Sequence, residues 1–157
     1  MNVNDYLIDQ NEADWNAFLQ SWAWLFPRSF TLWLVNRFAD LFIVSDDASV
    51  NLLRSDIGTL TKIADSRDHF AELIDQNSNA EELLFIPLVD RCVEAGMPLA
   101  AGQCYAYKML PVLGGKYELD NIYVAQLSEY IPFLADIHHQ LRDLPDGTKV
   151  KIVIGKA

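Results

Sequence analysis

The sequence predicts an α+β fold in which an antiparallel β-meander and a β-hairpin are packed by an N-terminal helix, a central helix pair and a C-terminal helix. Two observations predict the sheets: four short β-rich runs follow one another within residues 30–63, and an alternating run at 103–109 precedes a shorter one at 121–124. A third observation predicts the helices, because apolar residues recur at helical spacing around these runs. The length of 157 residues fits one domain.

Residues 1–29 are expected to be an N-terminal helical segment of this domain, and residues 30–157 its α+β body. Aromatic residues from Trp15 to Trp22 recur at helical spacing and predict an amphipathic helix over 12–25. Cap candidates lie at residues 9–11, and Pro27 ends the helix. Such a stripe is more often part of a core than a docking face, so we favour the core interpretation over partner docking.

The four β-rich runs predict an antiparallel meander, because connections of so few residues cannot contain crossover helices. The runs occupy residues 30–35, 41–44, 50–53 and 59–63. Asp46 and Asp47 separate the second run from the third. Adjacent acids in a tight β-turn are far more often turn formers than metal ligands, and we interpret them so.

A pair of helices is predicted after the meander. The first begins at a cap at Asp65 or Ser66 and ends near residues 76–78. The second begins with Asn79, which precedes Glu82 in the pattern of a capping box, and ends at Gly96, a suitable residue for the position after a helix. Pro87 lies inside the second helix and predicts a kink or a break into two short helices.

The C-terminal part predicts a helix over 128–142 with one apolar face. Pro132 is expected in its first turn or at its true start, because proline is tolerated there. An alternating run at 149–154 then predicts a closing strand.

The hairpin at 102–124 is the stretch around which we expect the chain to be organised, with the other elements as its cover. Its long loop contains Gly114 and Gly115, one of which is expected to hold a positive φ. The following Lys116 gives a superficial likeness to a phosphate-binding loop. The spacing GxxxxGK[ST] is missing and no helix begins there, so we do not interpret the loop as an anion site.

Composition and charge limit the classes of function. The chain is 51% hydrophobic and 22% charged, which excludes disorder as a description of the whole chain. Its formal net charge is −10, without a basic tail, which disfavours nucleic-acid binding and leaves a basic partner or simple solubility as explanations. The longest apolar runs are too short to span a bilayer and the N-terminus lacks a basic start, so no membrane role and a cytoplasmic location are expected.

The residues that most often carry chemistry do not form a recognisable motif. Cys92 and Cys104 lie among apolar neighbours and are expected to be free buried thiols. His69, His138 and His139 occur in no metal-binding or nucleophile pattern. Adjacent helical residues point about 100° apart, so at most one of the last two faces inward, as a satisfied core histidine. We expect no metal, no cofactor and no enzymatic activity.

Several short motifs, in order and at consistent separation, resemble one bacterial family. They are FADLF at 38–42, GTL at 58–60, IPLV at 86–89, GQCY at 102–105, PVLGG at 111–115, NI at 121–122, HHQ at 138–140 and LPDGT at 144–148. The family is named after the C-terminal domain of a type VI secretion DNase-effector immunity protein, and the resemblance runs from about Phe30 to the end. Members commonly have glycine where this chain has Ala39, so we expect a backbone conformation there that does not require glycine.

The resemblance implies a non-enzymatic protein-binding module, an immunity protein that neutralises a cognate basic toxin, a nuclease, by covering its active-site cleft. The family has no established catalytic residues, so it implies none here. The alternative is a stand-alone small-ligand-binding or regulatory domain with a pocket under the loop of 102–124.

Candidate contacts with a partner or ligand are polar residues of the predicted turns and of the hairpin with its loop. They are Asp46, Asp47, Tyr105, Lys108, Gly114, Gly115, Glu118, Asp120 and Asn121. Glu129, at a predicted helix start, is a further acidic candidate for a basic partner.

Overall fold

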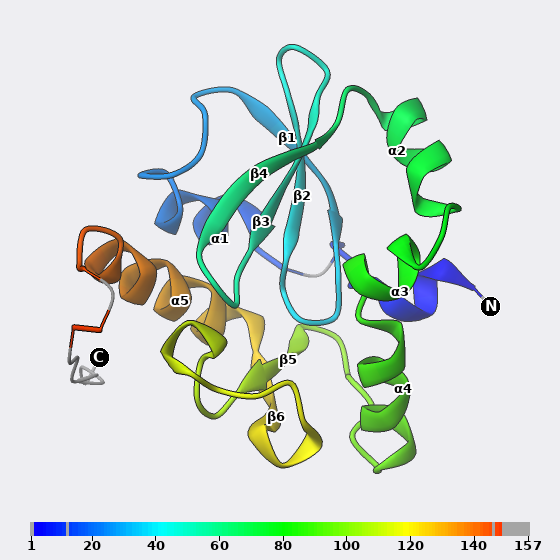
Figure 1. Cartoon of the computed structure of the whole chain (residues 1–157), viewed down its shortest axis with the longest axis vertical. Helices are drawn as coiled ribbons and strands as arrows, with labels where there is room; N and C mark the ends of the chain where they lie inside the picture. The colour runs from blue at the N-terminus through cyan, green and yellow to red at the C-terminus, as the bar shows by residue number, and fades with distance from the viewer. Residues whose placement is uncertain (1, 12, 146, 149–157) are drawn as a thin grey trace.

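The predicted meander is confirmed in a computed structural model of the chain, which describes residues 2–11, 13–145 and 147–148. Four antiparallel strands form one sheet in the order of the chain (Figure 1). They are β1 (Phe30–Val35), β2 (Leu41–Ser45), β3 (Val50–Arg54) and β4 (Thr59–Ala64).

The predicted hairpin is also confirmed, but it forms a second sheet of two antiparallel strands beside the meander. Its strands are β5 (Gln103–Tyr107) and β6 (Ile122–Gln126). The backbone N–H of Tyr105 donates to the carbonyl oxygen of Arg37 at 2.8 Å and ties β5 to the turn between β1 and β2. The expectation that the other elements cover the hairpin is wrong, because it is the meander that lies between two groups of helices (Figure 1).

The helices cover both faces of the meander. On one side lie α1 (Trp15–Ser21) and α5 (Leu127–Leu141), and on the other lie α2 (Arg67–Ile74), α3 (Asn79–Leu83) and α4 (Ile86–Glu94) (Figure 1). Short 3₁₀ turns occur at Val3–Tyr6, Pro111–Leu113 and Leu119–Asn121.

Two hydrophobic cores follow from the two-residue period of the strands. In β2, Leu41 and Ile43 point to the core shared with α1 and α5, whereas Phe42 points to the core shared with α2 and α4. Strand β5 divides in the same way, with Cys104 on the first side and Tyr105 on the second. The aromatic stripe of α1 belongs to the first core, which confirms the core interpretation.

Helix α1 is shorter than predicted, because the chain caps it later. The side chain of Asp14 accepts the backbone N–H of Ala17 at 3.2 Å, so the helix begins at Trp15 and the caps expected at residues 9–11 are wrong. After Ser21 the chain continues in turns to Phe26.

Local signals placed the ends of the next helices. Ser66 caps α2, because its hydroxyl oxygen accepts the backbone N–H of His69 at 3.0 Å, as predicted. The predicted break near Pro87 is confirmed: α3 and α4 are separate, and Phe85 between them adopts a left-handed φ of 52°. Gly96 follows α4 with a φ of +82°.

The capping box at Asn79 is wrong, because its side chain has a different partner. The amide nitrogen Nδ2 of Asn79 donates to the carbonyl oxygen of Leu73, at the end of α2, at 2.7 Å. Ser78 occupies the cap position instead, and its hydroxyl donates to Glu82 Oε1 at 3.1 Å.

Helix α5 begins directly after β6, so Pro132 lies inside the helix and its predicted place in the first turn is wrong. The start is fixed from outside the helix, because the backbone N–H of Leu127 donates to the carbonyl oxygen of Gly102 at 2.9 Å. The predicted strand at 149–154 lies outside the described residues. No helix of the described residues is both long and apolar enough to cross a membrane.

Ala39 holds a left-handed φ of 63°, a region that favours glycine but that alanine adopts here. This agrees with the expectation that the position does not require glycine. The conformation is imposed by the tight turn between β1 and β2, in which the N–H of Ala39 donates to the carbonyl oxygen of Asn36 at 3.1 Å.

Candidate functional site

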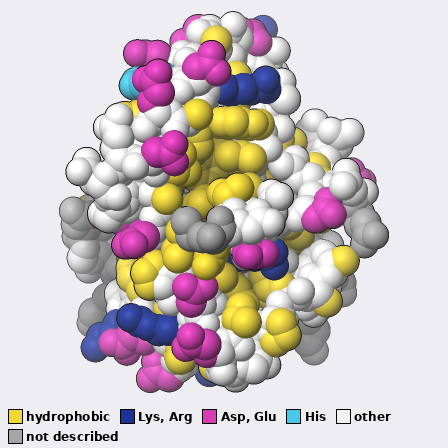
Figure 2. All heavy atoms as spheres, turned by 90° about the vertical axis from the view of Figure 1, so that its right-hand side faces the viewer, with side chains coloured by type: hydrophobic (Ala, Val, Ile, Leu, Met, Phe, Trp, Pro, Cys, Tyr) yellow, Lys and Arg dark blue, Asp and Glu magenta, His cyan; other side chains and the backbone are white. Residues whose placement is uncertain are grey.

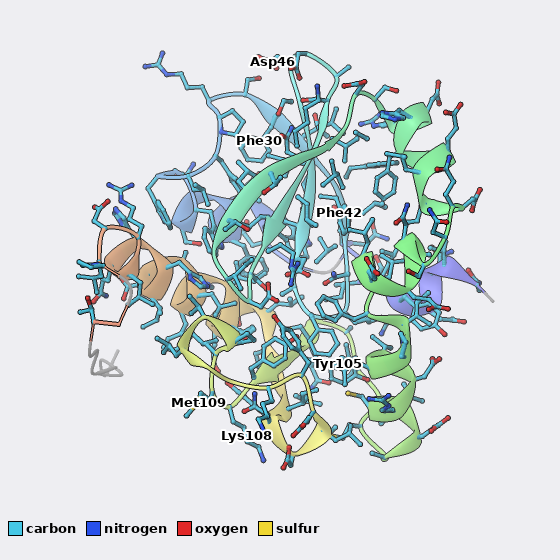
Figure 3. All side chains as sticks on the ribbon, viewed as in Figure 1. Phe30, Phe42, Asp46, Tyr105, Lys108 and Met109 are labelled. Carbon is cyan, nitrogen blue, oxygen red and sulfur yellow. The ribbon has the colours of Figure 1, made fainter. Side chains whose placement is uncertain are left out.

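The structure does not bring the predicted site residues together. Asp46 lies at the tip of the β2–β3 turn, whereas Lys108 lies in the loop after β5, at the opposite end of the molecule (Figure 3). Glu118 and Asp120 are exposed and belong to this same loop. The candidates therefore divide into two separate groups.

Asp46 and Asp47 form a turn, as predicted. The carboxylate of Asp47 accepts the backbone N–H of Ser49 at 3.0 Å and its hydroxyl at 2.5 Å. These hydrogen bonds lower the pKa of Asp47. Asp46 lines a surface cavity together with Ser66 and Asp68, so the turn lies next to the beginning of α2.

Tyr105 is a core residue and not a surface contact. Its side chain is 1% exposed, packs against Phe38, and donates its hydroxyl to the carbonyl oxygen of Met97 at 2.7 Å. The strand alternation predicted that Tyr105 would face away from Cys104. The structure shows that both faces of β5 are covered, with Cys104 in one core and Tyr105 in the other.

Asn121 and the two glycines shape the loop between β5 and β6. The Asn121 side chain accepts from the Met109 N–H at 2.9 Å and donates to the carbonyl oxygens of Met109 at 3.0 Å and Lys116 at 2.8 Å. Gly114 holds a φ of +97°, as expected, and a side chain on Gly115 would overlap the Met109 carbonyl group. These residues define the loop's conformation.

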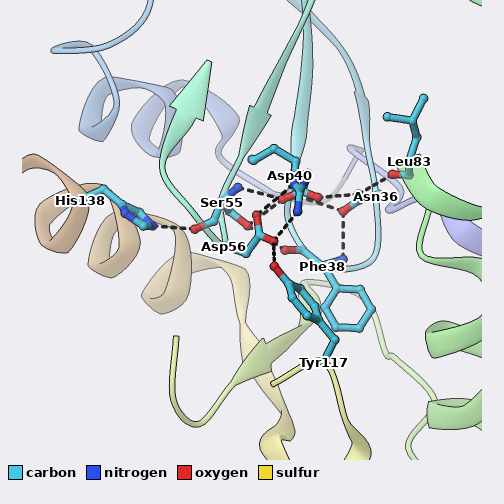
Figure 4. A network of polar contacts seen from close by, with 9 residues as sticks. Asn36, Phe38, Asp40, Ser55, Asp56, Leu83, Tyr117 and His138 are labelled. Atoms are coloured by element: carbon cyan, nitrogen blue, oxygen red, sulfur yellow. Dashed lines mark hydrogen bonds and ion pairs between the residues drawn. The ribbon is translucent and has the colours of Figure 1, made fainter. Parts of the chain in front are cut away.

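A buried polar network lies where the β1–β2 and β3–β4 turns meet (Figure 4). The carbonyl oxygen of the Asn36 side chain accepts the backbone N–H groups of Phe38 and Asp40, each at 3.0 Å. Its amide nitrogen donates to Asp40 Oδ2 and to the Leu83 carbonyl oxygen, each at 2.9 Å. Asn36 thus fixes the β1–β2 turn and connects it to α3.

Asp40 is the central acid of this network. Its side chain is 1% exposed, and Oδ1 accepts the N–H and the hydroxyl of Ser55 at 2.8 and 2.9 Å. Burial, followed by the nearby charge of Asp56, raises the pKa of Asp40 to about 6, against the opposing effect of its hydrogen bonds. A proton on Oδ1 has an acceptor, because the Ser55 hydroxyl can instead donate to the Phe38 carbonyl oxygen at 3.0 Å.

Asp56 connects the network to the loop and to the surface. It forms a bidentate ion pair with Arg54, with N···O distances of 3.0 and 2.6 Å, and accepts the Tyr117 hydroxyl at 2.6 Å (Figure 4). Arg54 also lies over the Phe85 ring at 5.8 Å from its centre. These contacts join β3, the β5–β6 loop and the segment between α3 and α4.

His138 is the satisfied core histidine that the sequence predicted. It is 3% exposed, and Nε2 lies 2.7 Å from the Ser55 carbonyl oxygen, to which it donates. Burial lowers the pKa of His138. His139 instead stacks on Trp24, with ring centres 4.6 Å apart. Among the described residues, no group of three or more His, Cys, Asp or Glu side chains is arranged to hold a metal ion.

The largest concentration of exposed acids lies on α2, α3 and α4 and at their ends. We call these residues the acidic helical face; they are Asp65, Asp68, Glu72, Asp75, Glu81, Glu82, Asp90 and Glu94. Arg67 and Arg91 are the basic residues of the same segment. Figure 2 looks onto this side of the molecule and shows acidic side chains around a hollowed apolar area.

The acidic helical face was absent from the predicted site. The signal was present in the sequence, since these acids lie within one segment, but their common exposure depends on three consecutive helices lying along the same side of the molecule (Figure 1). An apolar centre with a charged rim is an arrangement that protein-binding surfaces often have.

Two adjoining cavities beside α4 form the other hollow of interest. They measure about 240 and 440 Å³, and Arg37 and Leu99 line both of them. Gly102 and Gln103, at the start of β5, line the smaller one. The predicted small-ligand pocket was placed under the loop of 102–124, whereas these cavities lie at its N-terminal end only.

The comparisons with known proteins support the resemblance. The model of the family described as "T6SS immunity protein Tdi1, C-terminal" matches residues 64–138 of this chain. The match confirms the resemblance, over a shorter range than the one expected from Phe30 to the end. A search of the curated proteins finds no match.

Proposed function

Starting from the match of residues 64–138 to this immunity family, we propose that the protein is an immunity protein that binds and neutralises a cognate type VI secretion toxin. The family match is the observation that carries the proposal. The matched range contains α2 to α4, and with them the whole acidic helical face. We infer that this face contacts the toxin.

The charge of the surface favours a basic toxin, and a nuclease in particular. A nuclease presents positive potential to the phosphates of its substrate. An acidic inhibitor therefore associates with the nuclease faster than a neutral protein does, and its charge favours the basic toxin over neutral partners. The net charge of −10 has the required sign. Neutralisation then consists of covering the toxin's cleft, which needs no catalysis by the immunity protein itself.

Coexpression tests this proposal. A candidate toxin encoded beside this protein is produced in a bacterial host with and without it, and viable counts and chromosomal DNA integrity are measured. We expect the toxin alone to kill and to degrade DNA, and the pair to grow and to copurify as a complex. A toxin that kills equally in both strains, without a complex, would contradict the proposal.

A second candidate function is the small-ligand-binding domain, which the two cavities around Arg37 favour. The volume of the larger cavity lies in the range of small-ligand sites, and both cavities combine apolar walls with a cationic group. Arg37 itself lies outside the matched residues, although much of the lining of both cavities lies within them.

A further inference from the structure

Arg37 is a cation without an ionic partner among the described residues. No described carboxylate oxygen lies within 4.0 Å of its guanidinium group. Its Nη2 donates to the carbonyl oxygen of Asn4 at a long 3.3 Å, and its Nε is buried without a hydrogen-bond partner in the described part of the chain. A guanidinium group carries five N–H donors, so most of its capacity is available.

The backbone holds Arg37 in a fixed position between the two cavities. Its carbonyl oxygen accepts the Tyr105 N–H at 2.8 Å, which connects it to β5. The residues on either side belong to the turn that the buried Asn36 side chain fixes through Phe38 and Asp40. The backbone from which the Arg37 side chain extends is therefore fixed, which lowers the entropy that a ligand must offset on binding.

The walls of the cavities define the chemistry of the ligand. Leu99 lines both spaces, and Ile8, Val89 and Val93 contribute apolar surface. Four carboxylates also line them, from Asp5 and Asp9 on the N-terminal segment and from Asp90 and Glu94 on α4. This negative rim disfavours phosphates and other multiply charged anions, because Arg37 is the one Lys or Arg that lines the cavities among the residues that the structure describes.

We propose that the Arg37 cavities bind a peptide-like ligand whose single carboxylate pairs with Arg37 while its cationic and apolar parts lie against the acidic rim and Leu99. A planar guanidinium group and a carboxylate match in a bidentate arrangement of two parallel hydrogen bonds. The proposal goes beyond the immunity role and does not depend on it, because a peptide-like ligand can bind without a toxin. The larger cavity shares Asp90 and Glu94 with the acidic helical face.

Nuclear magnetic resonance of the ¹⁵N-labelled full chain tests the site with the dipeptide lysyl-leucine as probe. Lysyl-leucine amide, which lacks only the carboxylate, is the matched control ligand. We expect saturable shifts of the Arg37 Nε–H signal and of the amides of residues 99–103 with the acid, and at least tenfold weaker binding of the amide. Equal binding of acid and amide, or no saturable shift, would overturn the proposal.

Two variants and one control locate the binding. Arg37→Gln should weaken lysyl-leucine binding at least tenfold, whereas Arg91→Gln, an exposed arginine of α4 that lines a different cavity, should leave it unchanged. Leu99→Trp fills the space that both cavities share and should block binding with Arg37 intact. If Arg37→Gln perturbs folding, Leu99→Trp still tests whether the ligand binds in these cavities. Binding that survives both substitutions would reject the site.

The carboxylate has two possible sources, a small molecule or a protein chain. Adding the cognate toxin to the dipeptide-loaded protein distinguishes them. Release of lysyl-leucine, together with weaker toxin binding by Arg37→Gln, assigns the carboxylate to the toxin, and simultaneous binding of both assigns it to a small molecule. Failure of the toxin to bind would contradict the immunity role alone, because the dipeptide titration needs no toxin.

Discussion

At the scale of single residues, Asp40 is the group whose environment departs most from that of an ordinary surface carboxylate. It is enclosed by two turns, it lies near Asp56, and its hydrogen-bond partners are all within the protein. The folded state consequently holds a proton on Asp40 up to a pH at which the unfolded chain has released it, because burial and the charge of Asp56 raise the pKa from 3.8 to about 6.

The free energy of unfolding should therefore carry a contribution from Asp40 that falls as the pH rises from about 4 to about 6, by up to about 3 kcal/mol. The folded state binds more protons than the unfolded state in this window, so raising the pH favours unfolding. Urea denaturation of the wild type and of Asp40→Asn across this range measures it. The variant should show a flatter dependence, and parallel curves would contradict the assignment.

The two cysteines give another prediction at this scale. Both are free and fully buried, and burial raises the pKa of Cys92 to about 11 and that of Cys104 to about 12. The reactive thiolate is thus scarce at neutral pH. A thiol reagent should react slowly with the native protein. After denaturation without reductant it should label both cysteines. Rapid labelling of the folded chain would show that one thiol is accessible.

At the scale of elements, the β5–β6 loop is held by backbone packing as much as by side chains. Gly114 needs its left-handed conformation, with open space around it, whereas Gly115 needs the absence of a side chain next to Met109. Gly114→Ala should therefore cost about 1 kcal/mol of unfolding free energy, and Gly115→Ala about 2 to 4 kcal/mol.

Thermal and denaturant melts measure these costs, with Lys116→Ala as the control. Lys116 is exposed, and its side chain is expected to change stability by less than about 0.5 kcal/mol. Equal costs for the two glycine substitutions would show that the overlap with the Met109 carbonyl group is relieved by a small shift of the loop.

At the scale of the whole molecule, the acids are divided between opposite sides of the meander. Asp68 and Glu72 are exposed on α2, and Glu129 and Asp136 are exposed on α5. Each pair consists of one Asp and one Glu, so substituting both residues changes the net charge equally in the two pairs. The pairs differ only in their position on the molecule. Comparing them tests where a basic toxin binds.

Charge reversal on α2, Asp68→Lys with Glu72→Lys, should slow association with the toxin at least tenfold at low salt. The matched reversal on α5, Glu129→Lys with Asp136→Lys, should have a much smaller effect, because it lies across the meander from the acidic helical face. Stopped-flow association rates across a salt series measure both, and added salt should reduce the difference, since exposed charges are screened within about 10 Å at ~0.1 M ionic strength. Equal effects of the two reversals would reject the face as the docking surface.

The sequence by itself determined the features that depend on neighbours along the chain. The two-residue period of 41–44 set which β2 side chains enter each core, Ser66 capped its helix, and Pro87 marked the break between α3 and α4. The charge of the acidic segment was also present in the composition. These features arise from local backbone preferences and strand geometry, which operate in any fold that contains the segment.

Only the tertiary structure decided which of these residues meet. It buried Tyr105, placed Asp46 and Lys108 at opposite ends, and left Arg37 between two cavities without a carboxylate close enough to pair with it among the described residues. Residue type and spacing do not encode these outcomes, because each depends on contacts between segments distant in the chain. The start of α5 also depends on a contact between distant segments. The backbone N–H of Leu127, the first residue of α5, donates to the carbonyl oxygen of Gly102.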